Sequence, residues 1–244
     1  FGKLMEDSGS VAAIARFMTE KLGPQRAILA VVLAGALVTY GGVSLFVAFF
    51  VIGPMAQALF RAADIPGRLM PAAIALGTST FTMTALPGTP AIQNAIPMPF
   101  FGTTPFAAPG LGVIAAGIML GFGLWWLSRA EAAARRSGEG FGTTTVAPDA
   151  AADDQLVRER ASTASAFDPP EVRRGHQSTS APGILVAVLP LVVVVVVNLV
   201  MSMMVLPRID TGFLAEEQWG AIPLSSVSGV WSVVVALASA SVAL

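Results

Sequence analysis

Residues 27–60 read AILAVVLAGALVTYGGVSLFVAFFVIGPMAQALF, a run of 34 residues without a charged side chain. A run this long and apolar needs lipid as its solvent. As one straight helix it would extend roughly 51 Å, against a hydrocarbon core of about 30 Å. The pair Gly41-Gly42 interrupts the run near its middle. We therefore predict two shorter helices, 27–38 and 43–60, that form a re-entrant hairpin, with two thin membrane spans as the alternative.

The composition of the whole chain indicates the same class of protein. Only 12% of the residues are charged and the mean hydropathy is +0.73, whereas soluble domains carry about 25% charged residues. The net charge of −1 provides no basic surface for nucleic acid. The absence of cysteine excludes disulfides and thiolate metal sites, and no motif indicates a cofactor. We predict an all-α polytopic membrane protein in contact with the lipid bilayer.

Charges and helix breakers divide the chain into four predicted regions. The apolar stripe in residues 9–22 indicates an amphipathic helix on the membrane surface, although a soluble helix packed on a loop would look the same. In the second region we predict a helix from about Pro71 to Leu86 that stops at Pro87-Gly88, with a short helix resuming near Ala91. The regions are an interfacial segment 1–26; a transmembrane region 27–128 with hairpin 27–60, broken helix 69–98 and span 109–128; a disordered linker 129–181; and a second transmembrane half 182–244 with spans 182–206 and 222–244.

The distribution of cations predicts the topology. Seven arginines lie in the linker and four cations in residues 1–26, whereas the loop 207–221 contains only Arg208. By the positive-inside rule the linker and the first segment are cytoplasmic. Both fall on one side only if residues 27–60 enter and leave the membrane on that side. The chain begins at Phe1 and stops at Leu244 inside an apolar run, so we expect a piece of a longer protein.

The two interrupted segments are the candidate binding site. Irregular backbone at membrane depth requires protein or a watery cavity around it. Free N–H groups at helix breaks, with hydroxyl and amide side chains, suit a carboxylate. The alternative is that these serines and threonines bond to their own backbone and support packing. The candidate substrate-binding residues are Thr39, Tyr40, Gly41, Gly42, Ser44, Thr78, Ser79, Thr80, Thr82, Thr84, Gly88, Thr89, Gln93 and Asn94.

The polar residues elsewhere receive structural interpretations. We interpret His176 as a solvated linker residue and Asn198 as a hydrogen-bonding group between helices. Glu6 and Asp7, beside Lys3, are predicted to be solvated at the membrane interface. Residues 69–128 contain no ionisable side chain, so this stretch supplies no proton carrier at membrane depth.

The first nine residues, FGKLMEDSG, resemble the FGKLMxDSG signature of the gluconate permease family. The order of amphipathic helix, interrupted apolar tract and hydroxyl-rich broken segment over residues 1–130 is also similar. The resemblance implies a bacterial inner-membrane symporter for gluconate or a short hydroxy acid such as 3-hydroxybutyrate. The implied coupling ion is a proton, with sodium as the alternative. The implied fold has two inverted repeats, each with a re-entrant hairpin and a broken helix, joined by a cytoplasmic linker.

These observations predict a secondary active transporter that imports a small organic anion. The alternatives are a channel and a structural membrane subunit without carrier activity, and a homodimer is compatible with either outcome. A membrane-embedded enzyme would need an acid/base or metal constellation at depth, and the sequence shows none there.

Overall fold

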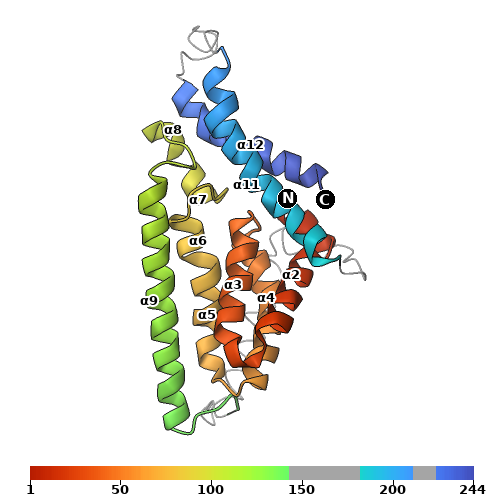
Figure 1. Cartoon of the computed structure of the whole chain (residues 1–244), viewed down its shortest axis with the longest axis vertical. Coiled ribbons are helices and arrows are strands. Elements are labelled where there is room, and N and C mark those ends of the chain that lie inside the picture. Colours follow the sequence, from red (N-terminus) through yellow and green to blue (C-terminus); the bar gives the residue numbers. More distant parts are fainter. Residues whose placement is uncertain (143–181, 211–223) are drawn as a thin grey trace, which may run out of the picture.

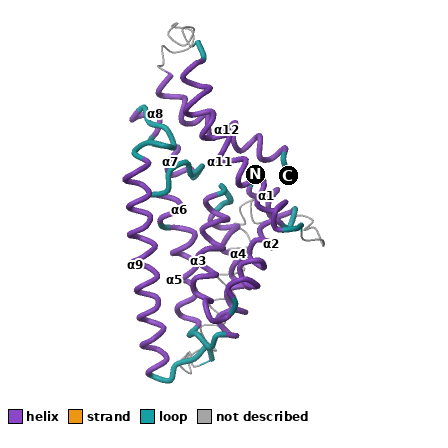
Figure 2. Tube along the Cα trace, viewed as in Figure 1, coloured by secondary structure: helices purple, strands orange, loops and turns teal. Residues whose placement is uncertain are grey.

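The computed structural model describes residues 1–142, 182–210 and 224–244, and these residues form helices joined by turns, with no strand among them (Figure 2). The predicted helical class is therefore confirmed. Two described helices, Pro109–Arg136 and Ile184–Arg208, are long and apolar enough to cross a membrane, and a bent pair over residues 10–40 makes up to three. Linker residues 143–181, with His176, and loop residues 211–221 lie outside the described part of the chain.

The run that begins at residue 27 forms two helices, α3 (Ala27–Tyr40) and α4 (Leu45–Ala62). They are separated at the glycine pair, where Gly42 adopts a φ of 92° that only glycine tolerates easily. The amide of Gly42 donates to the Thr39 carbonyl at 3.0 Å, which closes the turn. The break thus lies where the sequence predicts it, and the re-entrant course of the pair stays a prediction.

The predicted broken helix consists of four short pieces. They are α5 (Met70–Ser79), α6 (Phe81–Thr84), α7 (Ile92–Ala95) and α8 (Met98–Phe101). The first break comes at Thr80, whose φ of −108° and ψ of −106° are not helical. The sequence predicts the break only at Pro87, where the ring ends a helix by removing a hydrogen-bond donor. Helix α5 therefore ends at Ser79, well before Pro87, whose ring prevents a helix from continuing.

A long outer helix, α9 (Pro109–Arg136), lies along one side of the molecule (Figure 1). Its buried residues are few, and large apolar side chains such as Leu111, Ile118 and Phe122 are more than 60% exposed. Exposed apolar surface of this extent suits lipid. The helix continues through Arg136, beyond the end predicted for this span at residue 128. These apolar helices make the chain an integral membrane protein.

The centre of the fold is α3, which packs against α2 (Ser10–Leu22), α4 and α5. Gly77 of α5 allows the closest approach, because a Cβ at this position would collide with the carbonyl of Val32. Val11 and Ile14, at the start of the apolar stripe of α2, are fully buried in the same core. A helix that the sequence assigns to the membrane surface thus also packs within the chain.

The remaining helices surround this core. The short α1 (Gly2–Asp7) precedes α2, and 3₁₀ turns η1 (Pro24–Arg26) and η2 (Gly67–Leu69) precede α3 and α5. In the second half, α11 (Ile184–Val200) continues into a π-helical turn η3 (Met201–Val205) and a 3₁₀ turn η4 (Leu206–Arg208). The last helix, α12 (Leu224–Val242), crosses α11, and α11 packs on α2 (Figure 1).

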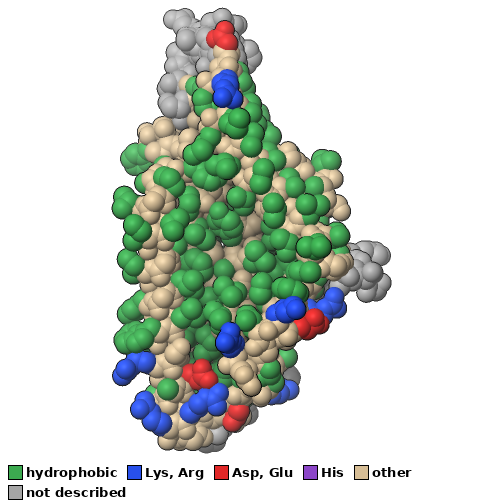
Figure 3. All heavy atoms as spheres, viewed as in Figure 1, with side chains coloured by type: hydrophobic (Ala, Val, Ile, Leu, Met, Phe, Trp, Pro, Cys, Tyr) green, Lys and Arg blue, Asp and Glu red, His purple; other side chains and the backbone are tan. Residues whose placement is uncertain are grey.

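Most of the visible charged side chains gather toward one end of the molecule, below a largely apolar face (Figure 3). There Arg68 donates to both carboxylate oxygens of Glu139, at 2.6 and 2.7 Å. This hydrogen-bonded pair lowers the pKa of the Glu139 carboxyl below its ordinary value. The amide of Phe141 donates to Asp64 at 2.9 Å. These contacts tie the chain after α9 to the turn between α4 and α5.

Candidate functional site

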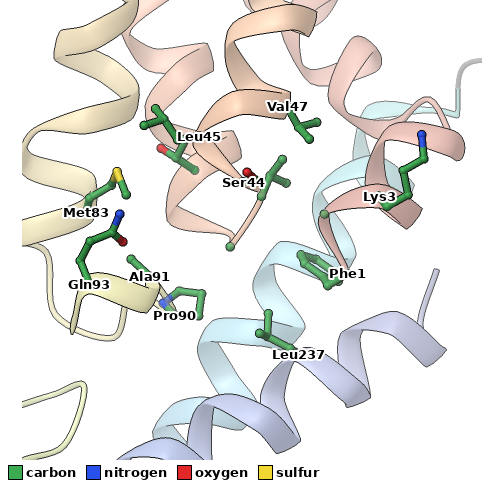
Figure 4. Close-up of a pocket in the computed structure, with 14 residues that line it drawn as sticks. Phe1, Lys3, Ser44, Leu45, Val47, Met83, Pro90, Ala91, Gln93 and Leu237 are labelled. Carbon is green, nitrogen blue, oxygen red and sulfur yellow. The ribbon is translucent and has the colours of Figure 1, made fainter. Parts of the chain in front are cut away.

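A cavity of about 640 Å³ lies where the two interrupted segments meet (Figure 4). The turn between α3 and α4 forms one wall, and the stretch from α6 to α7 forms the opposite wall. The start of the chain and α12 complete the lining. This volume falls in the range of small-molecule sites, about 300–1,000 Å³. The lining residues are Phe1, Gly2, Lys3, Thr39, Gly42, Val43, Ser44, Leu45, Val47, Met83, Pro90, Ala91, Gln93 and Leu237.

Four residues predicted to bind substrate line this cavity. Thr39, Gly42 and Ser44 come from the turn between α3 and α4, and Gln93 comes from α7. The Gln93 side chain is exposed and makes no hydrogen bond to another residue in the described part of the chain. Its carboxamide can both donate to a carboxylate and accept from a hydroxyl.

Direct contacts join the two interrupted segments beside the cavity. The Tyr40 hydroxyl donates to the Pro87 carbonyl at 2.8 Å. The Thr39 hydroxyl lies 3.3 Å from the hydroxyl of Thr82. A Cβ at Gly42 would approach the Pro90 ring to 2.8 Å. The structure therefore brings together the two segments that the sequence identifies as candidate sites.

Four candidate threonines of the broken helix make hydrogen bonds of the kind expected if they support packing, the alternative to substrate binding. Each of these four donates its hydroxyl to a backbone carbonyl four or five residues earlier and lies outside the cavity lining, whereas the buried hydroxyl of Thr89 has no hydrogen-bond partner within the described residues. Thr78 donates to Ile74 at 2.8 Å, Thr80 to Leu76 at 2.6 Å, Thr82 to Gly77 at 2.9 Å and Thr84 to Thr80 at 2.9 Å. The Ser79 hydroxyl lies 3.1 Å from the Thr78 hydroxyl, and Ser79 is not among the lining residues.

The other predicted residues surround the second break. Asn94 donates to the Met83 carbonyl at 2.8 Å, and the Gly88 amide donates to the Pro105 carbonyl at 2.7 Å. Gly41 lies directly against the side chain of Leu191 in α11. Thr89 is buried. These predicted residues are not among those that line the cavity.

Residues 1–102 match the family model described as GntP family permease. We call residues 1–102 the GntP segment because they resemble that family. The resemblance to the gluconate permeases inferred from the opening motif is thus confirmed. The chain is also 40% identical over 241 residues to the "Uncharacterized transporter YxjC" of Bacillus subtilis (strain 168), which covers 97% of this chain and 48% of that protein. The chain therefore spans about half the length of the curated relative it matches. No solved structure matches it significantly.

The start of the GntP segment contributes to the cavity, which the reasoning from sequence missed. Gly2 packs on the turn between α3 and α4, since a Cβ there would lie 3.3 Å from the amide nitrogen of Ser44. Lys3 lines the cavity, and its amine lies 3.2 Å from a carboxylate oxygen of Asp7 and 3.6 Å from one of Glu6. The opening motif was the signal that could have indicated this role.

The environment of this charged cluster differs from the solvated interface that the sequence predicts. The Glu6 side chain is only 13% exposed, and the facing atoms of Lys3 and Asp7 have almost no exposed surface. Burial acts to lower the pKa of the Lys3 amine, but the neighbouring Asp7 and Glu6 carboxylates outweigh it and raise the pKa above the ordinary value. Lys3 is therefore a stable cation at the edge of the cavity.

Beyond the GntP segment, Asn198 of α11 reaches the second break. Its side-chain amide donates to the Gly88 carbonyl at 3.0 Å, and the residue is fully buried. Asn198 thus forms a hydrogen bond to another segment as predicted, but the acceptor lies in the break between α6 and α7 and not in a helix. The bond connects the second half of the chain to the broken helix of the first. Within residues 1–142, 182–210 and 224–244 no group of three His, Asp or Glu side chains is placed to hold a metal ion.

Proposed function

We propose that the protein is a secondary transporter that imports a small organic anion together with a proton. The observation that carries this proposal is the 640 Å³ cavity between two interrupted helical segments, with the Lys3 cation at its edge. The match of residues 1–102 to a permease family and the similarity to a protein named as a transporter support it. The charge of the cation favours an anionic substrate over a neutral one.

The lining favours a short hydroxy acid. Met83, Leu237 and Val47 offer apolar surface to a carbon chain. The Gln93 carboxamide and the turn at Gly42 and Ser44 offer polar contacts to a carboxylate or hydroxyl. 3-Hydroxybutyrate combines a carboxylate and one hydroxyl with apolar carbons, whereas gluconate carries a hydroxyl on every carbon beyond its carboxylate, so the apolar part of the lining favours the shorter acid.

Alternating access would use the two interruptions as hinges, because irregular backbone absorbs changes in φ and ψ more readily than a continuous helix. In this proposal the turn between α3 and α4 re-enters the membrane, and residues 129–181 are a cytoplasmic linker to a second, inverted repeat in a bacterial inner membrane. The contacts of Asn198 and Leu191 with the breaks support a site shared between the halves.

Transport by the intact protein in proteoliposomes tests this proposal. Labelled gluconate, 3-hydroxybutyrate and citrate would be offered with an imposed proton gradient, with a sodium gradient and with neither. We expect saturable uptake of at least one hydroxy acid that the proton gradient drives above equilibrium. Flux that does not saturate would indicate a channel, and absence of flux for all three anions would contradict the proposal.

A further inference from the structure

We propose that Lys3 is the anion-binding cation of the cavity and that Asp7, assisted by Glu6, carries the coupling proton. In the empty site the Lys3 ammonium pairs with Asp7. When Asp7 takes up a proton, the ammonium is released to pair with the carboxylate of the substrate. This inference rests on the proposed function, and it assigns the charged groups that perform the coupling.

The position of α1 is the first observation. A six-residue helix at the start of the chain lies beside the turn between α3 and α4, with Gly2 against Val43 and Ser44. Lys3 follows directly and is the only ionisable side chain that lines the cavity within the described residues. This cation borders the apolar side chains of Val47 and Leu45. A charge is costly in such surroundings, so we infer that Lys3 has a function other than solubility.

The pairing of this cation is the second observation. The Lys3 amine lies 3.2 Å from Asp7 and 3.6 Å from Glu6, and neither contact is an aligned hydrogen bond. In Figure 4 the amine points away from Gln93 and Met83 on the opposite wall. The flexible four-carbon stem of lysine allows the amine to turn into the cavity once the carboxylate releases it. In this proposal the substrate carboxylate can therefore replace Asp7 as the partner of Lys3.

The charge of the cluster supplies the reason for coupling. Two carboxylates face one ammonium, so the cluster has a net charge of −1 and opposes an anion that enters the cavity. One added proton on Asp7 brings the cluster to zero and removes the nearer partner of the ammonium, so that among the described residues Glu6 at 3.6 Å is the one carboxylate still facing it. An anion then restores an ion pair, so proton and anion each strengthen the binding of the other.

Other charges do not change this balance. The helices that pack on α1 are α2 and α4, which carry Arg16, Glu20, Lys21 and Arg61. No ion pair joins any of these four to Glu6 or Asp7 within the described residues. Arg16, Glu20, Lys21 and Arg61 are all exposed, so solvent screens them.

The transport step balances in charge and atoms. A proton from outside bonds to a carboxylate oxygen of Asp7, and the substrate carboxylate replaces Asp7 beside Lys3. On the inner side the anion leaves, the proton dissociates from Asp7 into the cytoplasm, and Lys3 returns to the carboxylate. One proton accompanies one monovalent anion, so the step moves no net charge. A potassium diffusion potential set with valinomycin should therefore leave the rate unchanged.

Substitutions of Lys3 test the anion site in the intact protein in proteoliposomes. Lys3→Met removes the charge at similar length, and we expect the KM for the transported anion to rise about tenfold or more, because a charge-assisted contact is lost. Lys3→Arg keeps the charge and should stay within a few fold of the wild type. Lys21→Met, which removes an exposed cation from α2, is the matched control and should have no effect.

Substitutions of the carboxylates test the proton role. In Asp7→Asn, we expect exchange of labelled for unlabelled anion to continue while accumulation driven by a proton gradient is lost, and the pH dependence of the exchange KM to flatten. Glu6→Gln should show a weaker form of the same change, and Glu20→Gln, an exposed acid on α2, should show none. Asp7→Glu should restore accumulation, which separates titration from folding.

The outcomes separate this inference from the proposed function. If the wild type carries none of the anions, both fail. If the wild type carries an anion and Lys3→Met leaves KM unchanged, Lys3 does not bind it. If Asp7→Asn and Glu6→Gln both retain accumulation driven by the proton gradient, or if uptake follows the potassium potential, the assignment of the proton to this cluster is wrong while the transporter stands.

Discussion

The two helix interruptions that meet at the cavity are built in different ways. The first separates α3 from α4 by a few residues, and Gly42 turns the chain with a backbone hydrogen bond to Thr39. The second extends from Thr80 to the start of α7, and threonine hydroxyls bonded to backbone carbonyls support it. The short turn presents polar residues to the cavity, whereas the long break contributes Met83, Pro90, Ala91 and Gln93.

This difference shows that a cluster of hydroxyls does not by itself make a binding site. In a membrane helix a threonine one turn after a carbonyl can satisfy itself locally, and the threonines at 78, 80, 82 and 84 do so. The Gln93 carboxamide, which makes no such bond among the residues described, lines the cavity, and Thr39 also lines it although its hydroxyl donates to the Gly35 carbonyl of its own helix at 2.8 Å. Three predictions test the comparison.

The largest expected effect concerns the packing beneath the long break. Gly77→Ala would place a Cβ against the Val32 carbonyl of α3, and overpacking of this kind destabilises by about 1–3 kcal/mol. We expect a lower unfolding temperature for the detergent-solubilised protein. Gly121→Ala on α9, where no atom lies within 4 Å, should be neutral or slightly stabilising. Equal unfolding temperatures for the two variants would show that α3 and α5 do not pack as closely as described.

The next prediction compares the Gln93 carboxamide, which lines the cavity, with the Thr84 hydroxyl, which is bonded to its own helix. Gln93→Ala removes a carboxamide from the cavity lining, and loss of a hydrogen bond from an exposed side chain to a charged group costs about 1.5 kcal/mol, so KM should rise roughly tenfold. Thr84→Ala removes an exposed hydroxyl bonded to its own helix and should change KM less than twofold. Uptake kinetics measure both. A larger rise in KM for Thr84→Ala than for Gln93→Ala would indicate that the threonines bind the substrate.

The smallest expected effect concerns the hydrogen bond between the two interruptions. Tyr40→Phe removes the donor to the Pro87 carbonyl, and we expect a loss of about 1 kcal/mol, seen as a few-fold decrease in kcat/KM. Ser128→Ala removes a hydroxyl that bonds to its own helix in α9 at 2.8 Å and serves as the control. If Tyr40→Phe transports like the wild type, the two interruptions move independently of this bond.

Much of the architecture could be predicted because it depends on local sequence. Uncharged runs predict helices in lipid, and Gly41-Gly42 predicts a break because glycine alone adopts the required φ at little cost. The early break at Thr80 could not be predicted from Pro87, because it arises where hydroxyls compete for backbone carbonyls and where Gly77 approaches α3.

The sequence by itself determined the membrane class, the helical composition and the interruption at Gly41-Gly42, since hydropathy, length and backbone preference act within a few turns of the chain. Only the tertiary structure decided which polar groups face the cavity. Lys3 and Gln93 lie about 90 residues apart in sequence and line the same cavity because α1 packs beside the turn between α3 and α4. Which faces of helices meet depends on the packing of distant residues, such as Gly77 on Val32, and no local pattern contains that information.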